Sequence, residues 1–143
     1  MRKRLERQEV IRRIVRRERI RTQRDLVERL KGYGFVCTQA TVSRDITEMG
    51  LRKLPEGVYV LAEDLHLQRM ISELVTSVVQ AEKLVIVKAS PGTAPGVAAA
   101  LDGAGLEEVV GSIAGDDTIL VITRSEGDAT AIVASIDKYR GRY

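Results

Sequence analysis

Hydrophobic and polar residues follow a helical spacing in the first part of the chain and a strand-like spacing later. Apolar positions form an imperfect helical stripe in residues 3–18 and follow a helical spacing in a stretch that begins at Thr22 and in residues 38–49. Two short apolar runs follow within residues 51–61, joined by Leu-Pro-Glu-Gly, a sequence that suits a type I turn. Three helices followed by a β-hairpin predict a winged helix-turn-helix domain.

The second half of the chain has the pattern of a small mixed domain. β-rich runs and helical segments alternate in it, with strands expected at 74–79, 84–88, 108–114 and 118–123 and helices at 94–104 and 128–139. This order predicts a ββαββα layer sandwich. Residues 63–70 are polar enough to be a linker or a short connecting helix. The predicted fold class is therefore α+β, with domains at residues 1–62 and 71–143.

The strands of the second domain are apolar on more than one face, as in the run Ile-Leu-Val-Ile at residues 119–122. Two helices can cover only one side of a four-stranded sheet, so another subunit must supply part of the burial. We therefore expect this half to be an oligomerisation domain.

Residues 38–49 combine a face for burial with a face for hydrogen bonding. Thr38 is placed to cap the helix and Gly50 to stop it. At about 100° per residue, the inward side chains are Val42, Ile46 and Met49. The opposite side, flanked by Thr41 and Ser43, carries Ala40, Arg44, Thr47 and Glu48. Such a face suits the DNA major groove, where Arg grips guanine and small side chains meet a thymine methyl. An ordinary amphipathic surface helix is the alternative.

The charges are divided between the two halves of the chain. Residues 1–62 hold 16 Lys and Arg against 8 Asp and Glu, whereas residues 63–143 hold 7 against 12, within an overall net charge of +3. A basic half attracts polyanions, because phosphate neutralisation supplies much of the affinity for nucleic acid. Arg52 and Lys53 lie at the base of the predicted wing, where a phosphate would pass.

The sequence gives little support for a membrane or a metal ion as a partner. The Arg-rich N-terminus has no uninterrupted apolar run, so it indicates neither a signal peptide nor a membrane-spanning helix. Cys37 is the only cysteine and His66 the only histidine, which excludes an internal disulfide and a zinc cluster. We expect a cytoplasmic protein with no metal site.

Two loops of the second domain carry candidate binding chemistry. Residues 90–96 read Ser-Pro-Gly-Thr-Ala-Pro-Gly and bring backbone N–H groups towards a helix N-terminus, as an anion site would, but they lack the Lys of a P-loop. Residues 115–118 place Asp116 beside Asp117 in an apolar hairpin, where a planar guanidinium would relieve their repulsion. Each loop could also be an ordinary turn built from Gly, Pro and Asp.

Two stretches of the chain resemble the bacterial arginine repressor family. They are Thr-Gln-Ala-Thr-Val-Ser-Arg-Asp at residues 38–45 and Gly-Ser-Ile-Ala-Gly-Asp-Asp-Thr at residues 111–118. The resemblance covers essentially the whole length and follows the family's order, a basic winged-helix domain before an acidic oligomerisation domain.

The resemblance implies a homo-hexamer of two stacked trimers that binds L-arginine between the trimers and has no other cofactor. It implies binding to double-stranded palindromic operators of arginine biosynthesis and catabolism genes. By position, the operator would be read by Gln39, Thr41, Ser43 and Arg44, and the arginine guanidinium held by Asp116 and Asp117. The strand-to-helix loop would add backbone groups at Gly92, Thr93 and Ala94 for the polar end of the ligand, a hypothesis that rests on the loop's chemistry and not on the resemblance. The family often has Gln or His where this chain has Pro95, so a side-chain contact from that position is not expected.

Two other function classes remain open from the residues alone. An enzyme, or an amino-acid-sensing subunit of one, could use a small ββαββα domain, but the sequence offers no nucleophile with its base and no histidine cluster. An RNA-binding module would stack bases on aromatic side chains, and the aromatic residues here are 3% of the chain and scattered.

Overall fold

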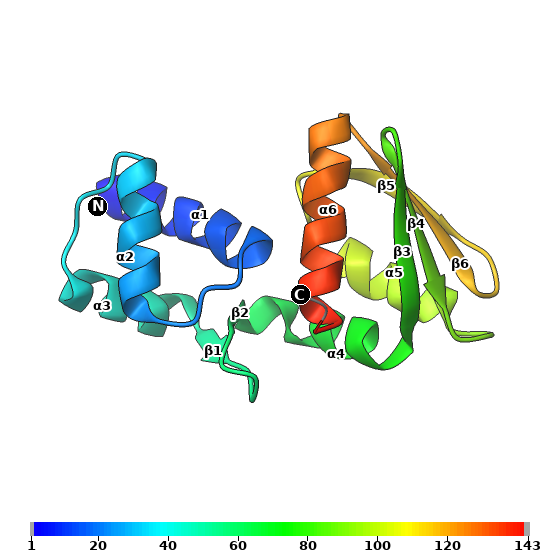
Figure 1. Ribbon diagram of the computed structural model, residues 1–143, viewed down its shortest axis with the longest axis horizontal. Helices are drawn as coiled ribbons and strands as arrows, with labels where there is room; N and C mark the ends of the chain where they lie inside the picture. Colours follow the sequence, from blue (N-terminus) through cyan, green and yellow to red (C-terminus); the bar gives the residue numbers. More distant parts are fainter. Residues whose placement is uncertain (1, 142–143) are drawn as a thin grey trace. The chain divides into compact units, whose positions relative to one another are not determined.

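A computed structural model describes residues 2–141, which form two compact units divided between Ala62 and Glu63 (Figure 1). Each unit is described by itself. Met1, the first residue of the expected first domain, and residues 142–143, the last residues of the expected second domain, lie outside the described residues.

The first unit is a winged helix-turn-helix, as the spacing of its apolar residues predicts. Its elements are three helices and a two-stranded antiparallel hairpin: α1 (Arg2–Arg17), α2 (Gln23–Gly32), α3 (Gln39–Met49), β1 (Leu51–Lys53) and β2 (Tyr59–Leu61). In the hairpin turn the Gly57 N–H donates to the Leu54 carbonyl at 2.8 Å, and Gly57 has a φ of 88°, which favours glycine.

Side-chain caps fix where α2 and α3 begin. The Thr22 hydroxyl oxygen accepts the Asp25 N–H at 3.0 Å, and the Thr38 hydroxyl oxygen accepts the Thr41 N–H at 3.2 Å. Gly50 ends α3 in the left-handed region with a φ of 70°. These three features confirm the start and stop signals expected from the sequence.

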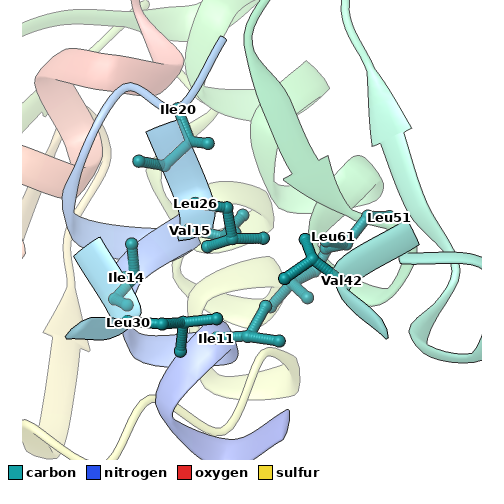
Figure 2. Packing of buried hydrophobic residues seen from close by; sticks show 9 residues of the cluster. All are labelled: Ile11, Ile14, Val15, Ile20, Leu26, Leu30, Val42, Leu51 and Leu61. Atoms are coloured by element: carbon teal, nitrogen blue, oxygen red, sulfur yellow. The ribbon is translucent and has the colours of Figure 1, made fainter. Parts of the chain in front are cut away.

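One apolar cluster holds the three helices and the hairpin of the first unit together (Figure 2). It joins all five elements through the buried side chains of Ile11, Ile14, Val15, Ile20, Leu26, Leu30, Val42, Leu51 and Leu61. Val42 comes from α3 and is fully buried, so α3 is anchored by its inward face while the rest of its surface is left for other contacts.

The second unit contains the predicted ββαββα order, preceded by one more helix. The short helix η1 (Ala62–Asp64) spans the boundary between the units. The elements that follow it are α4 (Leu65–Leu74), β3 (Val75–Ala81), β4 (Leu84–Ala89), α5 (Ala94–Gly103), β5 (Val109–Ala114), β6 (Thr118–Thr123) and α6 (Glu126–Tyr139). The four strands form one antiparallel sheet in the order β3-β4-β6-β5.

The segment expected to connect the domains lies inside the second unit. Residues 63–70 form η1 and the first part of α4, which packs against α5 and α6. Leu67 and Ile71 are buried at helical spacing, and Leu74 completes the helix instead of opening the first strand.

The sheet has one covered face and one open face. Val85 and Val87 of β4 pair with Val121 and Ile119 of β6, and all four are buried beneath α5 and α6. On the other face, apolar side chains remain partly or largely exposed: Val79, Leu84, Ile86, Ile113, Leu120 and Ile122. We call this set the open face of the sheet.

The end of α6 carries a buried polar cluster. The Tyr139 hydroxyl donates to the Asp64 carboxylate at 3.1 Å, and the Lys138 ammonium lies 5.9 Å from the centre of the Tyr139 ring. Asp64 is fully buried and Lys138 is 5% exposed. Burial lowers the pKa of Lys138 to about 8, although the charge of Asp64 opposes that shift.

Candidate functional site

The outward face of α3 is built as the sequence predicts. Val42 is buried and Ile46 and Met49 are partly buried, so the helix turns Ala40, Arg44, Thr47 and Glu48 to solvent. Gln39 is exposed, whereas Thr41 and Ser43 are half-buried at the flanks. The face therefore presents one guanidinium and one carboxylate among small hydroxyl and methyl groups.

Arg44 is free to bind a ligand. Within residues 2–141 its guanidinium makes no hydrogen bond or ion pair. The Gln39 amide lies 3.4 Å from the Gln23 side-chain oxygen, which places a donor and acceptor pair at the start of the same face. These groups have the chemistry to meet base edges in a major groove.

The wing adds cationic groups beside α3. Arg52 and Lys53 are exposed on β1, and the Lys53 ammonium lies 5.3 Å from the centre of the Tyr59 ring. An open groove of about 430 Å³ runs between the N-terminal ends of α2 and α3 and the wing, lined by Thr22, Gln23, Arg24, Gln39, Lys53 and Tyr59. A polyanion backbone could lie along this groove.

Many arginines of α1 are already paired within the protein. Arg2 pairs with Glu6, Arg12 with Glu9, and Arg4 with Glu48 of α3. Arg7 binds Asp45 of α3 through two hydrogen bonds. The sequence pattern does not reveal that Asp45 is buried, because an acidic residue between Arg44 and Ile46 reads as solvent-exposed.

The two loops of the second unit are brought together by main-chain hydrogen bonds. The Ala89 N–H donates to the Asp117 carbonyl at 2.8 Å, and the Ala94 N–H donates to the Asp116 carbonyl at 3.1 Å. The strand-to-helix loop and the β5–β6 turn therefore form one continuous surface, although they are more than twenty residues apart in the chain.

The two carboxylates differ in their surroundings. The Thr118 hydroxyl donates to the Asp117 carboxylate at 2.9 Å and accepts from the Lys88 ammonium at 2.9 Å. The Asp116 carboxylate makes no hydrogen bond or ion pair with any residue between 2 and 141. Both side chains are exposed, so an added cation can reach them.

The neighbouring residues 92–94 offer fewer free donors than expected. The Thr93 N–H and its hydroxyl both donate to the Ser90 carbonyl, at 3.1 and 2.6 Å. The Ala94 N–H is used by Asp116, and Ala94 is buried. Gly92 is exposed with a φ of 79°, and Pro95 lies exposed in the first turn of α5. The surface thus supplies carboxylates more readily than N–H donors.

Across residues 2–141, the His, Cys, Asp and Glu side chains form no group of three or more that could hold a metal ion. None of the helices in the same range is long and apolar enough to cross a membrane.

Both halves of the chain match families of known proteins. Residues 1–67 match the family described as "Arginine repressor, DNA binding domain", and residues 71–138 match "Arginine repressor, C-terminal domain". The chain is 42% identical to the arginine repressor of Carboxydothermus hydrogenoformans, over 94% of this chain and 97% of the relative. It is 47% identical to that of Thermus thermophilus, over 89% and 84%, and 45% identical to that of Caldicellulosiruptor bescii, over 92% and 93%.

These matches cover both units and confirm the resemblance seen at residues 38–45 and 111–118. The family consists of transcriptional regulators that use L-arginine as an effector, not of enzymes. The chain therefore belongs to the arginine repressor family and is an arginine-responsive transcriptional regulator with an N-terminal DNA-binding domain.

Proposed function

We propose that α3 enters the major groove of an operator and that Gln39, Thr41, Ser43 and Arg44 meet the base edges there. Arg44 is the strongest candidate, since it is exposed and unpaired among residues 2–141. A bidentate arginine contact to guanine discriminates strongly against other bases. Arg52 and Lys53 contact phosphates from the wing, where charge gives affinity without sequence preference.

The L-arginine site in this proposal is the surface formed by the two joined loops. Asp116 and Asp117 accept the guanidinium, whose planar donors fit carboxylates bidentately. Residues 92–94 form the wall beside it, near the polar end of the ligand. The main-chain bonds from Ala89 and Ala94 support this placement because they tie the main chain of Asp117 and Asp116 to the two ends of the strand-to-helix loop within a single subunit.

The assembly in this proposal is a homo-hexamer of two stacked trimers in the cytoplasm, with L-arginine between the trimers. The open face of the sheet supports self-association, because Val79 and Ile113 are 57% and 65% exposed. Exposed apolar surface of this kind marks interaction sites. Residues 1–62 act as the DNA-binding domain, residues 63–70 as the connection and residues 71–143 as the assembly and arginine-binding domain. The targets are palindromic operators of arginine biosynthesis and catabolism genes.

Two separate observations carry this proposal: Arg44 on α3 is exposed and unpaired among residues 2–141, and the second unit has an open carboxylate pair at Asp116 and Asp117. It is tested by light scattering and duplex DNA binding, each with and without L-arginine. Arginine stabilises the hexamer over smaller species and, by linkage, raises operator affinity to the extent that DNA prefers the hexamer. If the protein stays smaller than a hexamer at saturating arginine, the proposed assembly is wrong. If its operator affinity does not change with arginine, the proposed link between ligand and DNA is wrong.

A further inference from the structure

A buried ionic contact of the first unit joins α1 to the recognition helix α3. Arg7 Nε and Nη2 donate to the two oxygens of Asp45 at 2.5 and 2.9 Å. Gln8 Nε2 adds a bond to the same carboxylate at 3.1 Å. The Asp45 side chain is 2% exposed and that of Arg7 is 15% exposed.

The ionisation of this contact is stable around neutral pH. Burial by itself raises the pKa of Asp45, but the hydrogen bonds from Arg7 and Gln8 outweigh it, so the pKa is lowered overall. The hydrogen bond to Asp45 raises the pKa of Arg7. Both partners are therefore charged around neutral pH.

Apolar packing alone does not define how α3 is rotated. Val42 is the only apolar side chain of α3 that is fully buried, since Ile46 and Met49 are partly exposed. Hydrophobic contact is non-directional, so such a helix could rotate or slide with little loss of burial. A guanidinium fork on a carboxylate fixes both distance and angle.

The position of Asp45 on α3 links the Arg7–Asp45 contact to the orientation of the outward face, which would contact the DNA bases. At about 100° per residue, Asp45 lies on the side of the helix away from Ala40 and Thr47, with Arg44 next to it in sequence. Arg7 is one helical turn from Ile11, which is fully buried in the core. Because α1 is anchored in the core, the contact between Arg7 and Asp45 fixes the rotation of α3 about its axis.

Two further contacts join α1 to α3. Gln8 Nε2 also donates to Glu48 at 2.9 Å, and Arg4 lies 3.6 Å from the Glu48 carboxylate. Both of these contacts are exposed and therefore weaker than the buried fork. The Arg7–Asp45 pair remains the main directional constraint.

We propose that Arg7 and Asp45 are positioning residues that set the orientation of α3 and thereby the ability of the protein to tell its operator from other DNA. Neither residue acts by touching the bases. The inference rests on the proposed placement of α3 in the major groove.

The test measures duplex affinity of the full-length protein, with saturating L-arginine, for an operator selected by the wild type and for a random duplex. The variants are Arg7→Lys, which keeps the charge but loses the fork, and Asp45→Asn. Each lowers the ratio of operator to random affinity by about tenfold, the lower range of a lost bidentate base contact. Random-duplex affinity and its salt dependence do not change.

A third variant separates positioning from stability. Removing one partner of a buried ion pair destabilises a protein, but replacing both by apolar residues is often neutral or stabilising. The double variant Arg7→Met with Asp45→Leu is therefore expected to unfold no earlier than the wild type and still to lose operator discrimination. Arg2→Lys is the matched control, since Arg2 pairs only locally with Glu6 and is 93% exposed; it keeps the wild-type ratio.

Distinct results overturn this inference. If the three variants keep the wild-type ratio, the fork does not set the reading geometry. If the Met and Leu double variant weakens operator and random DNA alike and lowers the salt slope by about one unit, Arg7 is a phosphate contact instead. Arg44→Ala is measured in parallel. If Arg44→Ala also keeps full discrimination, the proposed reading helix itself is wrong; if only Arg44→Ala loses it, the positioning role alone is wrong.

Discussion

The Ala94 N–H donates to the Asp116 carbonyl oxygen at 3.1 Å and so ties the start of α5 to the turn between β5 and β6. The bond uses the main chain of Asp116 and leaves its carboxylate exposed and unpaired among residues 2–141. A substitution of that side chain therefore removes charge without removing the contact that joins the loops. A substitution of the Asp116 side chain can therefore test the proposed ligand site while the main-chain contact between the loops is kept.

The first prediction concerns which ligands the site accepts. L-arginine binds most tightly, because its guanidinium offers several planar donors together with a positive charge. L-lysine binds much more weakly, since its ammonium is compact and has no planar fork, and citrulline, which has no charge, binds more weakly still. Calorimetric titration of the three ligands measures this order. Equal affinity for arginine and citrulline would contradict a site based on two carboxylates.

The second prediction separates base reading from phosphate binding. Arg44→Ala costs about 1 to 3 kcal/mol in operator binding and relaxes preference at one base pair. Lys53→Ala weakens all duplexes alike and reduces the salt slope by roughly one unit. Fluorescence anisotropy with operator and random duplexes over a range of salt measures both. If Arg44→Ala reduces affinity equally for the two duplexes, α3 is not the reading element.

The third prediction concerns the open face of the sheet. Ile86→Glu in the full-length protein places a charge among the apolar side chains of neighbouring strands, so self-association weakens and the mass measured by light scattering falls. Ala134→Glu is the control, because Ala134 is exposed on α6, the helix that packs on the covered face. A wild-type mass for Ile86→Glu at micromolar concentration argues that assembly uses another surface.

The fourth prediction concerns the buried Lys138. Its pKa of about 8 in the folded protein is below the ordinary value of 10.5, so the unfolded chain binds more protons between these two pH values. Folding stability therefore rises with pH in that window, and the penalty for burying the charge is fully present below pH 8. Between pH 7 and 9.5 the gain is about 2 kcal/mol.

Urea unfolding of wild type and Lys138→Met at equal protein concentration isolates this contribution. The wild type gains stability relative to the variant as the pH is raised, because the other titrating groups cancel in the difference. Parallel pH profiles for the two proteins would show that Lys138 does not carry the effect.

Local signals in the sequence were sufficient for most of the secondary structure. The caps at Thr22 and Thr38 and the end of α3 at Gly50 could be predicted, because each of these residues acts on groups within four residues of itself. The helix α4 was less clear, since its polar residues read as a connection and only the packing of Leu67 and Ile71 on neighbouring helices explains it.

Features that depend on distant partners could not be read from the sequence. Asp45 is buried because Arg7, 38 residues away, supplies its hydrogen bonds, and Lys138 is buried in a cluster with Asp64. Likewise, the sequence identified the Asp116 and Asp117 turn and the residue 92–94 loop as candidates, but the amides of Thr93 and Ala94 are committed to carbonyl groups that only the folded chain brings close.

In the proposed function, Asp116 and Asp117 hold the L-arginine that controls DNA binding. The direct measurement is calorimetric titration of L-arginine into the wild type and into the double variant Asp116→Asn with Asp117→Asn, followed by operator binding of each. Asparagine keeps the turn but removes both charges. We expect the double variant to show no measurable arginine binding and to keep its basal affinity for DNA. Undiminished arginine affinity in that variant would rule out the proposed site and leave residues 115–118 as an ordinary turn.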